Sequence, residues 1–157
     1  MRHTISVLVE NKFGVLARIA GLFSARGFNI DSLTVGETED PTVSRMTIVV
    51  KGDDRTIEQV KKQLNKLIDV ISIRDLTKKD YIDRELVLFK VGFADNEKAK
   101  LAQSIEKLGG QILHRSHKAF LVQMAGPQEK VLALLEAMAP HGIKELTRTG
   151  KVAVVKD

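Results

Sequence analysis

Hydrophobic and polar residues alternate at the start of the chain and then change to a helical spacing. Between residues 3 and 10 every second residue is suited to one face of an extended segment, which predicts a β-strand. Between residues 15 and 26 apolar residues recur at intervals of three and four, as on the buried side of an amphipathic helix. Gly27 is the kind of residue that ends a helix. The pattern therefore opens with a strand, a turn and a helix.

Strand-like and helix-like patterns of apolar residues continue through the rest of the chain. In the first half they predict strands 28–37, 43–51 and 69–76, and a helix capped by Asp53 or Asp54 with Ile57, Val60, Leu64 and Leu67 on its buried side. In the second half they predict strands 85–93, 111–116, 119–125 and 143–148, a helix over 95–108, a helix with Pro127 in its first turn, and a tail from Thr149. The charged and polar residues 77–84 separate the two halves, so we expect domains at 1–76 and 85–157 joined by a linker at 77–84.

Both halves therefore have the element order βαββαβ, and we expect an α+β protein with two tandem ferredoxin-like βαββαβ domains. Each domain is predicted to be an antiparallel sheet with two helices on one face. The other face and both edges of such a sheet are open, and each half has only about 75 residues with which to build a core. We therefore expect a homodimer or a higher oligomer, formed through the first half.

The turn between the first strand and the first helix is a candidate binding site. Gly14 directly precedes the helix, whose first backbone N–H groups have no partner within the helix and point at one spot. Asn11 and Asn29 lie at the two ends of this strand–helix unit and offer side-chain hydrogen bonds. This chemistry suits a carboxylate, and a small amino acid is the ligand that we expect.

Composition narrows the functional class. The chain has 157 residues, of which 43% are hydrophobic and 29% charged, as in a globular protein. It has no cysteine, no recognisable signal peptide and no apolar run of the length that spans a bilayer, so we expect a cytoplasmic protein that does not enter a membrane. The net charge of +5 is modest and interspersed with acidic residues, which favours a solvated surface over a nucleic-acid patch.

Candidate catalytic and metal-binding residues are few. The chain has no nucleophile elbow and no phosphate-binding loop, and the four histidines (His3, His114, His117 and His141) do not form a ligand set with neighbouring carboxylates. Arg18 and Arg26 are possible phosphate ligands, but we expect them on the exposed face of the first helix. Aromatic residues make up 4% of the chain, and residues 43–50, the strand on which RNA-binding modules of this topology carry stacking rings, contain none. We therefore expect no nucleic-acid binding.

Three segments resemble one known family. The stretch ENKFGVLARIAGLFSARGFNIDSLTVG from Glu10 to Gly36, DPTVSRMTIVV from Asp40 to Val50, and GIKELTRTGKVA from Gly142 to Ala153 are similar to the small regulatory subunit of acetolactate synthase (acetohydroxyacid synthase). The resemblance implies that the first half is an ACT domain, a βαββαβ module that binds amino acids, and that the second half is the ferredoxin-like domain of that family.

The resemblance implies a regulatory subunit with no catalytic residues and no cofactor of its own. Its partner is then a large catalytic subunit that carries thiamine diphosphate, magnesium and FAD, which the small subunit activates. It would also make that enzyme sensitive to feedback by valine or another branched-chain amino acid, in the pathway to valine, leucine and isoleucine. The effector would lie between two ACT domains, held by Asn11, Gly14, Val15 and Leu16 of one copy and by Asn29 and Ile30 of the other. Phe13 stands where relatives commonly have proline or a small residue.

Two alternatives remain open at this point. One is a free-standing amino-acid-sensing ACT protein with another partner. The other is a small enzyme on a ferredoxin-like fold, such as an acyl-phosphate hydrolase.

Overall fold

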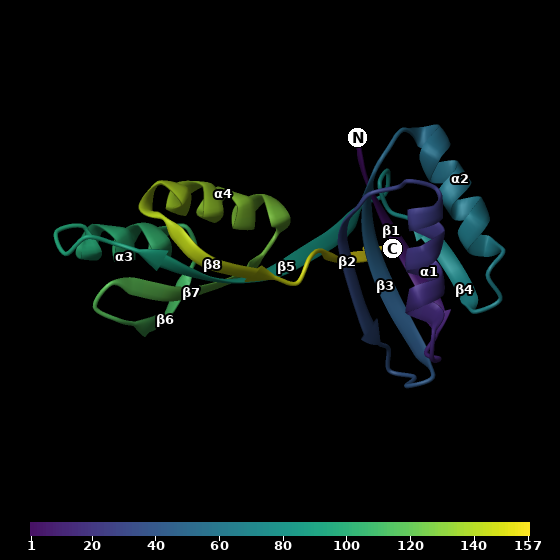
Figure 1. Cartoon of the computed structure of the whole chain (residues 1–157), viewed down its shortest axis with the longest axis horizontal. Coiled ribbons are helices and arrows are strands. Elements are labelled where there is room, and N and C mark those ends of the chain that lie inside the picture. Colours follow the sequence, from purple (N-terminus) through teal and green to yellow (C-terminus); the bar gives the residue numbers. More distant parts are fainter. The chain divides into compact units, whose positions relative to one another are not determined.

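The computed structural model describes all 157 residues and divides them into two compact units. The first unit comprises Met1–Ile82 together with Lys151–Asp157, and the second comprises Asp83–Gly150. Each unit is an antiparallel sheet with helices on one face, so the α+β class and the two βαββαβ units predicted from the sequence are confirmed (Figure 1). None of the α-helices combines the length and the apolar character needed to cross a membrane.

The first unit is a four-stranded sheet covered by two helices. Its elements are β1 (Arg2–Glu10), α1 (Val15–Ala25), β2 (Ile30–Glu37), β3 (Val43–Lys51), α2 (Asp54–Asn65) and β4 (Val70–Asp75). The strand order is β2-β3-β1-β4, with antiparallel neighbours throughout, so β2 and β4 are the two edges.

The core of this unit follows from the alternation in β1. Ile5, Val7 and Val9 point to the helical face of the sheet and are at most 1% exposed. They pack with apolar residues of β3 and of both helices, including Phe23 and Leu64. The helices therefore stay on the sheet by burying one stripe each, as the sequence predicted.

Two helix starts in this unit are fixed by single residues. Gly14 precedes α1 with φ 84° and ψ −6°, a left-handed conformation that only glycine adopts without a steric penalty. Asp53 caps α2, where its carboxylate accepts a hydrogen bond of 2.7 Å from the Thr56 N–H. Of the two aspartates considered as the cap, Asp53 is the one that performs this role.

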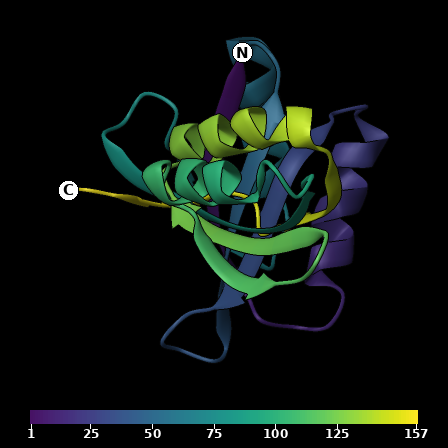
Figure 2. The same ribbon diagram turned by 90° about the vertical axis from the view of Figure 1, so that its left-hand side faces the viewer.

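The second unit repeats the same topology. Its elements are β5 (Tyr81–Gly92), α3 (Lys98–Lys107), β6 (Gln111–Arg115), β7 (Ala119–Gly126), α4 (Gln128–Met138), a short 3₁₀ turn (Ala139–His141) and β8 (Ile143–Arg148). The strand order is β6-β7-β5-β8, which matches β2-β3-β1-β4 position by position. In Figure 2 α3 and α4 run side by side over one face of this sheet.

Two segments differ from the sequence-based expectation. Residues 81–84, which we placed in a linker, are the first part of β5, and the predicted tail contains a ninth strand, β9 (Val152–Val155). The Lys156 N–H donates to the Asp80 carbonyl at 3.1 Å, which ties the end of the chain to the first unit. The start of β5 looked like a linker because half-buried Tyr81 and Asp83 alternate with exposed Ile82 and Arg84, so neither face of the strand is continuously apolar there.

Candidate functional site

The turn between β1 and α1 presents backbone donors with no partner in the chain. No side chain caps α1, and the N–H groups of Gly14, Leu16 and Ala17 donate no hydrogen bond. The Val15 N–H reaches the Lys12 carbonyl only at 3.4 Å. The positive φ of Gly14 turns the backbone so that these donors converge where the helix dipole is positive. A carboxylate is the group that such a cradle favours.

Asn11 holds this turn against the β2–β3 connection. Its backbone N–H donates to the Thr42 carbonyl at 2.7 Å. Its side-chain Nδ2 donates to Glu37 Oε1 at 3.1 Å and to the Pro41 carbonyl at 2.9 Å. The side-chain oxygen of Asn11 accepts no hydrogen bond, so it remains available as an acceptor. Asn11 thus fixes the turn in place and still has one polar atom free.

Arg18 and Asp69 form a charged pair beside Gly14 that the sequence reasoning did not identify. Arg18 Nε donates to Asp69 Oδ2 at 3.0 Å, and Nη2 binds the same oxygen. Asp69 is 7% exposed, and its backbone carbonyl accepts from the Glu10 N–H at 2.9 Å. Arg18 lies on the exposed face of α1, as expected, and its side chain, which is 50% exposed, reaches back over the start of the helix. The signal was its position four residues after Gly14, which places both on one side of the helix.

Asn29 and Ile30 lie at the other end of the sheet. Ile30 pairs with Val50, which pairs with His3 near the start of β1, whereas Glu37 pairs with Ser44 beside Val9 at the end of β1. β2 has eight residues, so its two ends are about 23 Å apart along the sheet. Asn29 Nδ2 donates to Asp31 Oδ1 at 3.2 Å, and its side-chain oxygen accepts nothing. Within one chain, four of the six predicted residues lie at the β1–α1 turn: Asn11, Gly14, Val15 and Leu16. The other two, Asn29 and Ile30, are distant from this turn.

Charges around the turn are mostly paired. Lys12 Nζ lies 2.8 Å from Glu10 Oε2, and the hydrogen bond between them raises the pKa of Lys12. Neighbouring Phe13 has no protein packed over its ring, and Leu16 is 46% exposed. The turn therefore combines free backbone donors with an exposed apolar flank.

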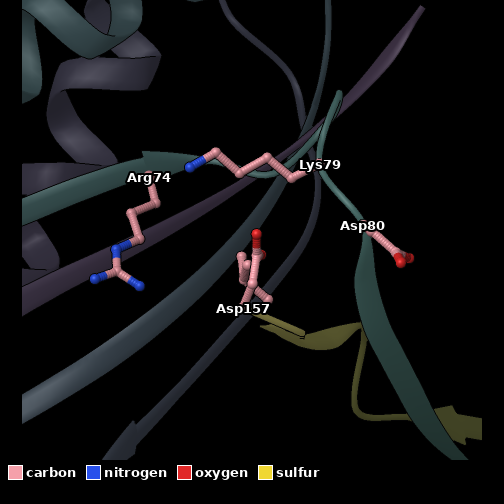
Figure 3. Close-up of a pocket in the computed structure, with 5 residues that line it drawn as sticks. Arg74, Lys79, Asp80 and Asp157 are labelled. Atoms are coloured by element: carbon pink, nitrogen blue, oxygen red, sulfur yellow. The ribbon is translucent and has the colours of Figure 1, made fainter.

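Two surface pockets lie away from this turn. One of about 470 Å³ in the first unit is lined by Arg74, Lys79, Asp80, Val155 and Asp157, and Figure 3 shows the Asp80 side chain pointing away from Arg74. A pocket of about 650 Å³ in the second unit includes His117 and His141. No group of three or more His, Asp or Glu side chains is arranged to hold a metal ion. Neither pocket contains any of the six residues proposed for the effector.

Comparison with known proteins gives matches over nearly the whole chain. Residues 5–72 match the family model described as the AHAS small subunit-like ACT domain, and residues 84–157 match the model described as the small subunit of acetolactate synthase. The chain is 50% identical over 156 residues to a probable acetolactate synthase small subunit of Archaeoglobus fulgidus, covering 99% of this chain and 98% of that protein. It is also 50% identical over 153 residues to a probable acetolactate synthase small subunit of Methanothermobacter thermautotrophicus, covering 97% of this chain and 91% of that protein.

A solved structure agrees with these sequence matches. The acetolactate synthase small subunit from Thermotoga maritima is 40% identical, with a TM-score of 0.89 over 99% of this chain and 98% of that one. The two sequences are similar over both units, so the relationship does not depend on the shared topology alone. The chain belongs to the acetolactate synthase small-subunit family.

Proposed function

We propose that this chain is the regulatory subunit of an acetolactate synthase and that it binds a branched-chain amino acid, valine first among them, at the β1–α1 turn. In this proposal it joins the large catalytic subunit in the cytoplasm, raises the activity of that subunit and makes it subject to feedback inhibition. The observation that carries the proposal is the group of unpartnered N–H donors at Gly14, Leu16 and Ala17, in a member of this family.

The edge position of β2 supports a site completed by a second copy. β2 has a hydrogen-bonded neighbour on one side only. If two copies pair their β2 strands antiparallel about a two-fold axis, the start of one β2 lies beside the end of the other. The end of β2 carries Glu37, which Asn11 contacts directly. This pairing brings Asn29 and Ile30 of the partner subunit to the turn of the first.

Exposed apolar side chains are consistent with that pairing. Leu16 in α1 and Val35 in β2 are 46% and 41% exposed, and Phe13 is fully exposed. Exposed large apolar residues are candidates for an interaction surface, and these three lie at the turn and on the edge strand that the proposed pairing involves. Dimerisation would bury them and would also remove an open sheet edge.

The available polar atoms match the parts of an amino acid. The first-turn N–H groups suit its carboxylate, and the free side-chain oxygens of Asn11 and of Asn29 of the partner subunit suit its ammonium group. Leu16 of the same copy, together with Ile30 of the partner subunit, offers apolar contact to a branched side chain. An amino acid with a charged side chain would have to bury that charge among them at a high cost.

In this proposal the chemistry belongs to the partner. Thiamine diphosphate, magnesium and FAD are assigned to the catalytic subunit, and this chain contributes no catalytic residue. The purified small subunit alone is therefore expected to form no acetolactate from pyruvate.

Reconstitution tests the proposal. Adding the small subunit to its catalytic subunit should raise acetolactate formation, and valine, leucine or isoleucine should then lower it. Calorimetric titration of the isolated small subunit with the three amino acids should show binding without the partner. If the chain bound one of them but did not co-purify with or activate the catalytic subunit, a free-standing amino-acid sensor would replace this proposal.

A further inference from the structure

We propose that Arg18 is a direct ligand of the effector carboxylate and that Asp69 is a built-in competitor for it. This inference rests on the proposed function and adds a cation to a site that otherwise offers the carboxylate only backbone N–H groups. Arg18 is then a residue that sets affinity for the carboxylate, and Asp69 limits that affinity.

The position of Arg18 carries the first step. A Cβ placed on Gly14 would lie 3.3 Å from Arg18 Nη1, so the guanidinium occupies the space that glycine leaves open. Helical side chains tilt toward the N-terminus, which brings a residue at position 18 back over position 14. Nη1 therefore lies at the same turn as the unpartnered N–H groups of Leu16 and Ala17.

The hydrogen bonding of Arg18 carries the second step. Asp69 occupies Nε and Nη2 through a single oxygen, Oδ2, and Nη1 makes no hydrogen bond. A guanidinium has five N–H donors in a fixed plane, so two donors on Nη1 remain available while Asp69 holds the other edge. The Arg18 side chain is 50% exposed, which leaves that edge accessible.

The burial of Asp69 carries the third step. The carboxylate is 9% exposed and Arg18 is its only ion-pair partner. Asp69 therefore draws the guanidinium toward the α2–β4 connection, away from an incoming carboxylate. Two carboxylates share one cation in the bound state, so neutralising Asp69 strengthens the attraction of Arg18 for the effector.

The test compares amino acids with their amides, in which the carboxylate is replaced by a neutral group. Valine, leucine and isoleucine are titrated by calorimetry into the full-length small subunit, each beside its amide. For wild type the acid should bind more tightly than the amide. In Arg18→Gln the acid should bind about 10- to 100-fold more weakly while affinity for the amide stays unchanged, because a charge-assisted hydrogen bond is lost.

Asp69→Asn is expected to change the affinity for the acid in the opposite direction. This near-isosteric variant should bind the acid several-fold more tightly than wild type and leave the amide unaffected. The double variant Arg18→Gln/Asp69→Asn, which leaves no buried charge unpaired, should again discriminate poorly between acid and amide. Circular dichroism is used to check that each variant is folded.

The outcomes separate this inference from the proposed function. If wild type binds none of the three amino acids, the proposed function fails and this inference falls with it. If wild type binds but Arg18→Gln keeps its preference for acid over amide, only this inference is overturned. If Arg18→Gln and Asp69→Asn both weaken acid and amide alike, the pair is a structural clamp and Arg18 is not a ligand.

Discussion

Asn11 and Glu37 are joined by a hydrogen bond of 3.1 Å from Nδ2 to Oε1, which ties the turn after β1 to the last residue of the edge strand β2. The same nitrogen also donates to the Pro41 carbonyl at 2.9 Å. The contact makes the turn part of the edge along which we propose that a second copy pairs. A change at Asn11 should therefore affect both the turn and the completed site.

Asn11→Asp is expected to weaken effector binding about tenfold. The carboxylate lacks the two donors of Nδ2 and stands beside Glu37, a like charge at hydrogen-bond distance. Valine titration of the small subunit measures the change. Asn96→Asp, in an exposed segment of the second unit just before α3, is the matched control and should bind as wild type does. Unchanged valine affinity in Asn11→Asp would remove Asn11 from the site.

Gly14→Asp is expected to abolish valine feedback while activation of the catalytic subunit remains. The new carboxylate would lie beside Arg18 and the first-turn N–H groups, where we propose that the effector carboxylate binds. It would also force a side chain into the left-handed region, at a cost of about 1 kcal/mol. A loss of about 3 kcal/mol in effector binding corresponds to more than a hundredfold.

Gly27→Asp is the control that separates strain from chemistry. Gly27 also has a positive φ, 69°, but a Cβ there would meet nothing within 4 Å. It should lose similar folding stability and keep its response to valine. Acetolactate formation by the reconstituted enzyme, measured against valine concentration, distinguishes the two variants. Equal responses in both would mean that strain alone explains Gly14→Asp.

Val35→Lys is expected to dissociate the dimer if β2 is the pairing edge. Val35 lies in β2 and is 41% exposed, so a charge there would be buried at the proposed interface. Ile71, in the opposite edge strand β4, is 51% exposed and is the matched position. Sedimentation at micromolar concentration should show mostly monomer for Val35→Lys and dimer for Ile71→Lys. The reverse result would move the interface to β4.

The sequence predicted the fold well because both sheets and all four α-helices bury one clear apolar face. Val7 in β1 and Val60 in α2 are examples, each 0% exposed and each at its expected place in the period. The start of β5 was missed because it has no continuous apolar face, and β9 was missed because its apolar run is only four residues long. The pairing of both strands also depends on residues far apart in the sequence. The Arg18–Asp69 pair was missed because its two residues are also far apart in the sequence, at a separation of 51 residues.

Glu85→Ala is expected to lower the free energy of unfolding of the second unit by about 2–3 kcal/mol. Glu85 is 2% exposed, and its two carboxylate oxygens accept from Arg148 Nε at 2.6 Å and Nη2 at 2.9 Å. The hydrogen bonds with Glu85 raise the pKa of Arg148, and the variant leaves that guanidinium without its partner. Urea unfolding measures the loss. Glu145→Ala, which breaks an exposed pair with Lys90, should change stability much less.

Asp53→Asn tests whether the cap of α2 contributes to the acid sensitivity of the first unit. The hydrogen bond from the Thr56 N–H lowers the pKa of Asp53 below its ordinary value of 3.8. A carboxylate whose pKa is lower in the folded state adds stability that is complete above the unfolded value and is lost as the pH falls through the folded value. Asparagine keeps an acceptor for Thr56 but has no charge to titrate.

The expected result is a difference in melting temperature that depends on pH. Wild type should be more stable than Asp53→Asn at about pH 6, and the difference should shrink as the pH falls below about 3.8, because the unfolded carboxyl takes up a proton before the folded one does. Thermal unfolding followed by circular dichroism across this range measures it. Glu39→Gln, which removes an exposed carboxylate that makes no hydrogen bond in this unit, is the matched control. A difference for Asp53→Asn that stayed constant across the range would show that the charge of the cap contributes nothing.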